Sequence, residues 1–114
     1  MLVLITRAPY GLEEAFAGLR LALAMAVNGV KTSVVMMEDG VYNAVGSQKP
    51  EVLKMPSNAD ATKELYDFDV QVSVVREDLK ERVVPESGLF DGLKVIDRSE
   101  LKKLVAEHDV VTTF

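Results

Sequence analysis

The chain contains no cysteine. This absence excludes disulfide bonds, thiolate metal sites and every mechanism that needs a thiol nucleophile or a persulfide. Apolar runs are short as well: the longest candidate, Leu19 to Val27, falls below the roughly 20 residues that a membrane-spanning helix needs. Glu13 and Glu14 lie just before this run and Arg20 lies within it, which does not suit the apolar region of a secretory signal. The composition therefore predicts a cytoplasmic protein with no membrane segment.

Basic residues are also in the minority, because 13 lysines and arginines face 18 aspartates and glutamates, for a net charge of -5. The basic residues are scattered along the chain, whereas binding to a phosphate backbone depends on clustered lysine and arginine. We therefore expect no direct nucleic-acid binding. A small basic pocket stays open as an alternative, because net charge does not describe every surface patch.

Common cofactor and catalytic patterns are missing too. His108 is the single histidine, and without a cysteine or a second histidine it is a poor metal ligand; a cation at a helix end is the favoured role. Gly11 and Gly18 lack the companion glycines and lysine of a phosphate-binding loop, and no serine lies in a nucleophile-elbow pattern. An enzyme using arginine with aspartate or glutamate as acid and base has no matching constellation. We expect no metal, no cofactor and no catalytic residues.

The residues that are present suit one globular domain. The chain has 114 residues and a mass of 12.5 kDa, which is long enough for one core and too short for two ordinary domains. Apolar residues make up 48% and charged residues 27%, the balance of a globular protein. A single domain is therefore predicted over residues 1–114.

Apolar runs and helical patterns alternate along this domain. The predicted strands are Leu2 to Thr6, Ser33 to Met37, Val70 to Val75, Leu93 to Ile96 and Val110 to Phe114. The predicted helices are Leu12 to Val27, Val41 to Val45, a brief helix from Asn58 or Asp60 through Tyr66, Arg76 to Arg82, and a last helix that Asp97 caps. This alternation predicts an α/β fold, a three-layer α/β/α sandwich around a five-stranded, largely parallel sheet. Strand order stays open.

Polar residues follow several of the predicted strands, at the edge where open α/β sheets keep their ligand crevices. Glu38, Asp39 and Gly40 interrupt the chain directly after the second predicted strand. The candidate crevice or partner-binding residues are Arg7, Tyr10, Glu38, Asp39, Val75, Arg76 and Arg82. One interpretation is a site for an anion or for the tail of a partner. The other is surface salt bridges with ordinary Asp-Gly turn chemistry.

A long loop from Gly46 to Asn58 carries a second set of candidates. It contains two prolines and few apolar anchors, so we expect it to be less ordered than its flanks or to be ordered by a neighbouring subunit. Val52, Leu53 and Met55 are its candidate interface residues. Small residues fill the helix that begins near Leu12; they indicate either good helix propensity or close packing against the sheet and another subunit. An oligomer is therefore expected.

Several short motifs resemble one known family when they are taken in order. They are Ala8-Pro9-Tyr10-Gly11, Asp39-Gly40-Val41-Tyr42, Gly46-Ser47-Gln48-Lys49-Pro50, Leu79-Lys80-Glu81-Arg82 and the closing strand from His108 to Phe114. Together they resemble the DsrE/DsrF family of sulfur-relay proteins, most closely its DsrF/TusC branch. The resemblance covers nearly the whole chain and independently implies a five-stranded, largely parallel sheet with helices on both faces.

The resemblance also implies where sulfur chemistry would lie. In that family a sulfur-carrying cysteine, where present, ends the third strand, upstream of an arginine that glycine follows. Arg82 matches the arginine, Val83 replaces the glycine and Val75 replaces the cysteine. A valine cannot accept or donate sulfane sulfur, so the fold is kept and the relay chemistry is lost.

Two functions fit this pattern. The preferred one is a non-catalytic subunit or scaffold of a DsrE/DsrF/TusC-like sulfur-relay assembly, a hetero-oligomer with homologous, cysteine-bearing subunits. The alternative is a stand-alone homo-oligomer that binds a small molecule or an anion and keeps the fold without the relay chemistry.

Overall fold

The computed structural model describes residues 1–8, 14–45, 58–89 and 91–114. Its strands are β1 (Leu2–Ile5), β2 (Ser33–Met36), β3 (Gln71–Val75), β4 (Lys94–Ile96) and β5 (Val111–Thr113). Its helices are α1 (Glu14–Val27), α3 (Asn58–Tyr66), α4 (Arg76–Glu81) and α5 (Arg98–Glu107), with 3-10 helices η1 (Glu38–Ala44) and η2 (Glu86–Gly88). All the predicted strands are present, each slightly shorter than its apolar run. No helix in these described ranges has both the length and the apolar character needed to cross a membrane.

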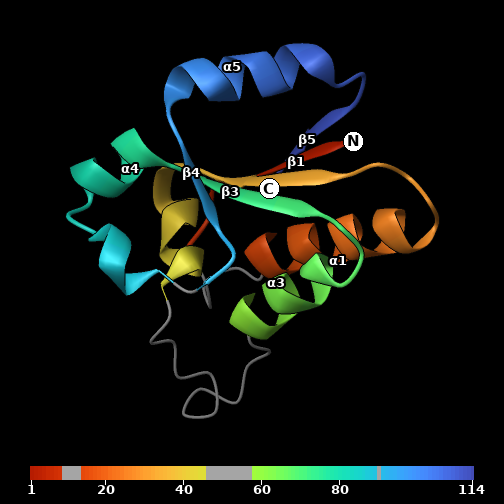
Figure 1. The fold of residues 1–114 in the computed structure, drawn as a ribbon, viewed down its shortest axis with the longest axis horizontal. Coiled ribbons are helices and arrows are strands. Elements are labelled where there is room, and N and C mark those ends of the chain that lie inside the picture. Colours follow the sequence, from red (N-terminus) through yellow and green to blue (C-terminus); the bar gives the residue numbers. More distant parts are fainter. Residues whose placement is uncertain (9–13, 46–57, 90) are drawn as a thin grey trace.

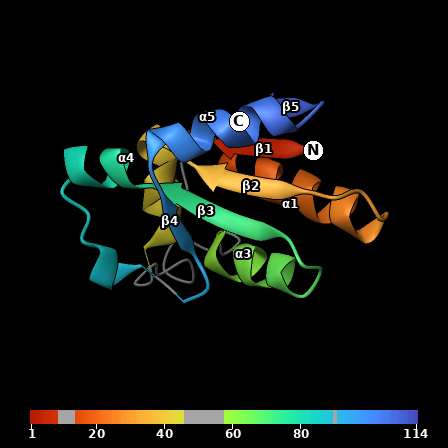
Figure 2. The same cartoon turned by 45° about the horizontal axis from the view of Figure 1, so that its top comes forward.

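The strands form one parallel sheet in the order β4-β3-β2-β1-β5. Helices α1 and α3 lie on one face of the sheet and α5 lies on the other (Figures 1 and 2). The predicted three-layer α/β/α sandwich with a five-stranded sheet is therefore confirmed. The order also shows that β2 and β3 are central, whereas β4 and β5 are the two edges.

Side chains alternate between the two faces of the sheet and build two unequal cores. The larger core lies under α1 and α3 and contains Val3, Ile5, Val34, Met36, Val72 and Val74. The smaller core lies under α5 and contains Leu2, Val35, Val75 and Ile96, covered by Leu101 and Leu104. Because α5 is the only helix of the described residues that covers this second face, Leu4 and Met37 remain only partly buried there.

Helix α1 approaches the sheet closely through its small residues. A Cβ atom on Gly18 would lie 2.4 Å from Ile5 Cδ1 and 2.9 Å from Phe114 Cδ2, so no larger residue fits without movement. Ala15 and Ala22 are buried on the same side of the helix. Close packing against the sheet is therefore part of the reason for the small residues; the predicted start of this helix at Leu12 lies outside the described residues.

The predicted end of the first helix at Val27 and the predicted cap of the last helix are confirmed. Gly29 follows α1 with φ of +84°, the left-handed conformation that glycine adopts at helix C-termini. Asp97 caps α5, and its Oδ1 accepts a hydrogen bond from the Glu100 backbone N–H at 2.8 Å. The predicted short helix from Val41 to Val45 is present, but its bounds differ, because η1 is a 3-10 helix that begins at Glu38, almost directly after β2, and ends at Ala44.

Candidate functional site

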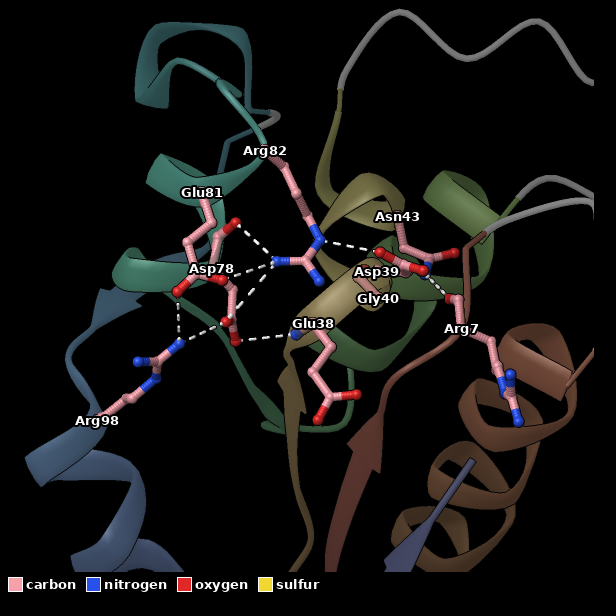
Figure 3. A network of polar contacts seen from close by, with 9 residues as sticks. All are labelled: Arg7, Glu38, Asp39, Gly40, Asn43, Asp78, Glu81, Arg82 and Arg98. Atoms are coloured by element: carbon pink, nitrogen blue, oxygen red, sulfur yellow. Dashed lines mark hydrogen bonds and ion pairs between the residues drawn. The ribbon is translucent and has the colours of Figure 1, made fainter.

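A network of charged side chains lies at the carboxyl end of the sheet, beside the ends of β2, β3 and β4 (Figure 3). We call it the Asp78 cluster; it comprises Glu38, Asp39, Asp78, Glu81, Arg82 and Arg98. Asp78 is its centre and is only 3% exposed. Its Oδ2 accepts a hydrogen bond from the Glu38 backbone N–H at 2.8 Å, and its Oδ1 accepts one from Arg98 Nη2 at 2.9 Å.

Local geometry explains why Asp78 can be buried as a carboxylate. Strand β3 runs into α4 without a loop, so Asp78 lies in the first turn of that helix, where the helix dipole favours negative charge. Glu38, which it bonds, has φ of +52°, an uncommon conformation for a residue other than glycine. Such conformations persist when surrounding contacts hold them. The Glu38 N–H to Asp78 hydrogen bond is one such contact, and it joins β2's end to α4.

The two arginines of the cluster approach Asp78 from different elements. Arg82 follows α4; its Nε donates to Asp39 Oδ1 at 2.9 Å, and its Nη1 lies 3.8 Å from Asp78 Oδ1. Arg98 begins α5, and its Nη2 donates to Asp78 and also to Glu81 Oε1, at 3.2 Å. The hydrogen bond to Asp39 raises the pKa of Arg82, and the hydrogen bonds to Asp78 and Glu81 raise the pKa of Arg98. Both guanidinium groups therefore stay charged.

The turn after β2 is fixed by packing against the end of β1. A Cβ atom on Gly40 would lie 1.9 Å from the Ile5 carbonyl oxygen, so only glycine fits. Asn43, which is fully buried, donates from Nδ2 to the Arg7 and Gly40 carbonyl oxygens at 2.8 and 2.9 Å. Gly40 is not among the glycines with positive φ. Close approach of the two backbones, rather than turn chemistry, therefore requires glycine at this position.

The structure brings together only part of the predicted site. Glu38, Asp39 and Arg82 meet in the Asp78 cluster. Arg76 instead lies 3.7 Å from Glu86, measured from Nε to Oε2. Arg7 pairs with Glu14 at 3.0 Å, and its side chain points away from the cluster (Figure 3).

Of the remaining predicted site residues, only Val75 lies among the described residues. Val75 is fully buried in the small core under α5, which corrects the expectation that it borders an open crevice. The candidate Tyr10 and the interface candidates Val52, Leu53 and Met55 lie outside the described residues, as does most of the predicted loop from Gly46 to Asn58.

Sequence reasoning missed three members of the cluster and its supporting asparagine. They are Asp78, Glu81, Arg98 and Asn43. A signal for two of them was present, because Asp78, Glu81 and Arg82 recur at helical spacing on α4. Arg98 carried no such signal: it reaches Asp78 only because β4 lies beside β3, an adjacency that the sequence does not reveal.

The charge balance of the cluster limits what it can bind. Its paired carboxylates, on Asp39, Asp78 and Glu81, outnumber the guanidinium groups of Arg82 and Arg98, and both arginines are engaged by carboxylates. An incoming anion would meet net negative charge. Within the described residues, no group of histidine and carboxylate side chains could hold a metal ion. The cluster is better suited to a rigid polar docking surface than to an anion or metal site.

A hollow of about 470 Å³ lies at the opposite end of the sheet. It is lined by Met1, Lys31, Ser33, Gln71, Leu104, Glu107, His108, Asp109 and Val110. His108 follows α5 directly, as predicted for a residue at a helix end, and its Nδ1 lies 2.6 Å from the Leu104 carbonyl oxygen. Because a carbonyl only accepts, Nδ1 must carry the proton. The hollow is mixed in charge and is separate from the Asp78 cluster.

The parallel sheet covered on both faces, with its polar cluster at the carboxyl end, defines a small α/β protein of the doubly covered, open-sheet class. The chain belongs to the DsrE/DsrF-like family, whose model matches residues 1–114. It is 34% identical to the uncharacterized protein MJ0989 of Methanocaldococcus jannaschii, over 98% of this chain and 96% of that protein. It is 27% identical to the intracellular sulfur oxidation protein DsrF of Allochromatium vinosum, over 95% of this chain and 90% of that protein.

A solved structure supports the same assignment. The crystal structure of the ychN protein from E. coli superposes with a TM-score of 0.88 at 27% identity and covers 99% of this chain and 97% of that chain. The predicted resemblance to the DsrE/DsrF family is therefore confirmed over the whole chain.

Proposed function

We propose that this protein is a non-catalytic subunit of a cytoplasmic sulfur-relay assembly, in which it binds cysteine-bearing members of its own family. The observation that carries the proposal is the combination of a family match over residues 1–114 with a chain that has no cysteine. A persulfide relay passes sulfur between thiolates, so a member without any thiol can take part only by binding. The DsrF relative, whose name refers to intracellular sulfur oxidation, supports the sulfur context.

The Asp78 cluster supports a binding role at the carboxyl end of the sheet. Asp78 and its two arginines hold η1, α4 and α5 in fixed relative positions. Around this base, the carboxylates of Asp39 and Glu81 are largely exposed. Pre-organised polar groups bind a partner at a lower entropic cost than flexible ones. A homologous subunit that presents basic or amide groups would fit this surface.

The test is to mix the protein with a cysteine-bearing homologue from the same organism and to measure complex formation by sedimentation. The substitution Asp39→Lys should weaken the complex by about tenfold or more, because it reverses an exposed charge on the docking surface. The matched control is Glu86→Lys, another exposed carboxylate, which pairs with Arg76 outside the cluster and should leave binding unchanged. Absence of any complex with the wild type would contradict the proposal.

The non-catalytic role has its own readout. Alone, the wild type should take no sulfur from a persulfide donor, whereas the homologue should be modified with or without it, as read by intact-mass spectrometry. Any stable sulfur adduct on the wild type would show that a group other than a thiol carries sulfur, and the non-catalytic assignment would then fail.

One observation favours the alternative of a stand-alone small-molecule-binding homo-oligomer, namely the hollow at the amino end of the sheet. Its volume of about 470 Å³ falls within the usual range of ligand pockets. Genes for cysteine-bearing relatives next to this one would favour the relay assembly, and their absence would favour the alternative. A thermal shift with small polar ligands, lost in Gln71→Trp, would locate binding at this hollow.

A further inference from the structure

The two edges of the sheet differ in how well they are protected against pairing with another strand. Edge strands are usually blocked by charged side chains, proline or bulges. Edge strand β4 carries the exposed Lys94. Edge strand β5, Val111–Thr113, contains neither a charge nor a proline. Of the usual devices, only its short length protects it.

The hydrogen bonds of β5 show which backbone groups it leaves open. Leu2 N–H donates to the Val110 carbonyl at 2.9 Å, and Phe114 N–H donates to the Leu4 carbonyl at 2.8 Å. In a parallel ladder, alternate residues bond to the same neighbour. Val110, Thr112 and Phe114 therefore turn their backbone groups toward β1, whereas Val111 and Thr113 turn theirs away from the sheet.

Two apolar side chains at the same edge are uncovered. Val110 is 51% exposed and Val111 is 38% exposed, although both are β-branched residues that favour burial in sheets. Register places Val111 beside Leu2 and Thr113 beside Leu4, on the face that α5 covers. Leu4 is itself only partly buried, so the exposed edge continues onto a thinly covered part of the sheet.

We propose that β5 pairs antiparallel with β5 of a second copy of this chain, so that the two sheets join into one. In this arrangement Val111 of each copy lies opposite Thr113 of the other. The outward N–H of each of these two residues donates a hydrogen bond to the outward C=O of the other. Thr112 lies opposite its own copy on the two-fold axis, and Thr–Thr pairs are favourable across antiparallel strands.

The chemistry of the edge is the reason to choose a second copy as the occupant. The two-fold axis puts Thr112 opposite its own equivalent and puts Val111, like Thr113, diagonally across from its own equivalent, so a charge anywhere in the strand would lie near a like charge. The strand Val111–Thr113 contains no charged residue. The outward N–H and C=O groups of Val111 and Thr113 in one copy are complementary to the same groups in a second, antiparallel copy. The proposal does not depend on the relay function. It also leaves the Asp78 cluster free for another partner, because β5 lies two strands beyond β2 in the sheet.

Sedimentation of the wild type from low to high micromolar concentration tests the proposal, together with two matched valine variants. Val111→Lys should raise the dimer dissociation constant about tenfold or more, because it places like charges together at the edge. Val27→Lys is the control: Val27 is 56% exposed at the end of α1, and the dimer should be unchanged. A wild type that stays monomeric, or a Val111→Lys variant that dimerises like the wild type, would overturn the proposal.

Amide exchange in the wild type gives a readout that does not rely on a variant. The N–H groups of Val111 and Thr113 should exchange more slowly as protein concentration rises, because they become bonded only in the dimer. The Thr112 N–H, which already faces β1, should change little and serves as the internal control. If the exchange rates of the Val111 and Thr113 N–H groups did not change with protein concentration, pairing at this edge would be ruled out, whatever the oligomeric state.

Discussion

At the scale of single residues, Val83 combines two unfavourable properties. Its φ is +54°, a conformation that costs a β-branched residue roughly 1–2 kcal/mol, and its side chain is 87% exposed. Glycine adopts this conformation freely, and the family pattern has glycine at this position. Val83→Gly should therefore be neutral or stabilising by about 1 kcal/mol in urea unfolding. The control Val105→Gly, at an exposed position inside α5, should cost about 1 kcal/mol. A loss in Val83→Gly as large as in the control would contradict the strain argument.

Tyr66 carries a hydroxyl that is buried and, among the described residues, has no hydrogen-bond partner. Replacing an unsatisfied hydroxyl with hydrogen removes a desolvation cost. Tyr66→Phe should therefore be neutral or stabilising by about 1 kcal/mol near neutral pH. Thermal unfolding of the two proteins in one buffer checks this, and a clear loss in the variant would show that the hydroxyl is hydrogen-bonded.

Burial also raises the pKa of Tyr66, which gives a pH dependence with a definite sign. The folded state holds the phenol proton more tightly than the unfolded chain, in which tyrosine ionises near pH 10. The contribution of Tyr66 to stability is therefore fully present below about pH 10. The free energy of unfolding falls as pH rises from about 10 to the higher pKa of Tyr66 in the folded state. Tyr66→Phe should show a smaller alkaline loss than the wild type.

Asp78 is the residue on which the cluster depends. Asp78→Asn keeps the size of the side chain but removes the negative charge that both arginines face. Because this position is buried, water cannot make up for the lost interactions. The expected loss is about 1–3 kcal/mol in the free energy of unfolding. The control Glu81→Gln, at an exposed side chain of the same cluster, should cost less than about 0.5 kcal/mol. Equal effects would show that burial of Asp78 contributes nothing.

At the scale of elements, the junction of β1 with η1 depends on one glycine. Gly40→Ala would drive a Cβ atom into the Ile5 carbonyl, which is backbone and cannot move aside without displacing the strand. The expected loss exceeds about 3 kcal/mol. Gly88→Ala is the matched control, since the nearest atom to its Cβ would be Pro85 Cγ at 3.7 Å, and it should be near neutral. A mild effect at Gly40 would mean that η1 can move away from β1.

The type of each element and its place along the chain were largely predictable, because the buried strands are mostly apolar runs that alternate with helical patterns. The orientation of side chains in β3 could be read in part, because Gln71 and Ser73 alternate with valines, which places Val75 on the face opposite Val72 and Val74. No local pattern shows that α5 covers that face at the end of β3. Val75 was therefore expected at an open crevice, although β3 turns it under α5.

The candidate site was predictable only where its residues lie close to strand ends. Asp39 follows β2, and Arg82 follows the short helix α4 that continues β3; both lie at the carboxyl end of the sheet, and they form an ion pair. Their link to Arg98 depends on β4 lying beside β3, and long-range strand order leaves no local pattern in the sequence. Burial of Asp78 likewise follows from tertiary packing rather than from its neighbours in the chain.

At the scale of the whole molecule, the unequal covering of the sheet separates sealed surfaces from open ones. The face under α1 and α3 is a continuous buried core. On the face under α5, Val75 and Ile96 are buried by the helix. The covering becomes less complete toward Leu4, which is partly buried, and toward the β5 edge. Interaction surfaces are therefore expected at the carboxyl-end cluster and at β5, and not at the position of the family's cysteine.

A thiol placed at Val75 would report on this sealing, because it can react only when the sheet opens. Central strands open mainly by near-global unfolding, so alkylation of Val75→Cys should be slower than that of an exposed thiol by a factor of about 10³ or more. Val27→Cys, on the exposed end of α1, provides the comparison. Adding urea below the unfolding transition should accelerate the reaction of Val75→Cys and leave that of Val27→Cys nearly unchanged. If both thiols reacted at the same rate in a folded protein, β3 would be open at its end, and α5 would not seal the position of Val75.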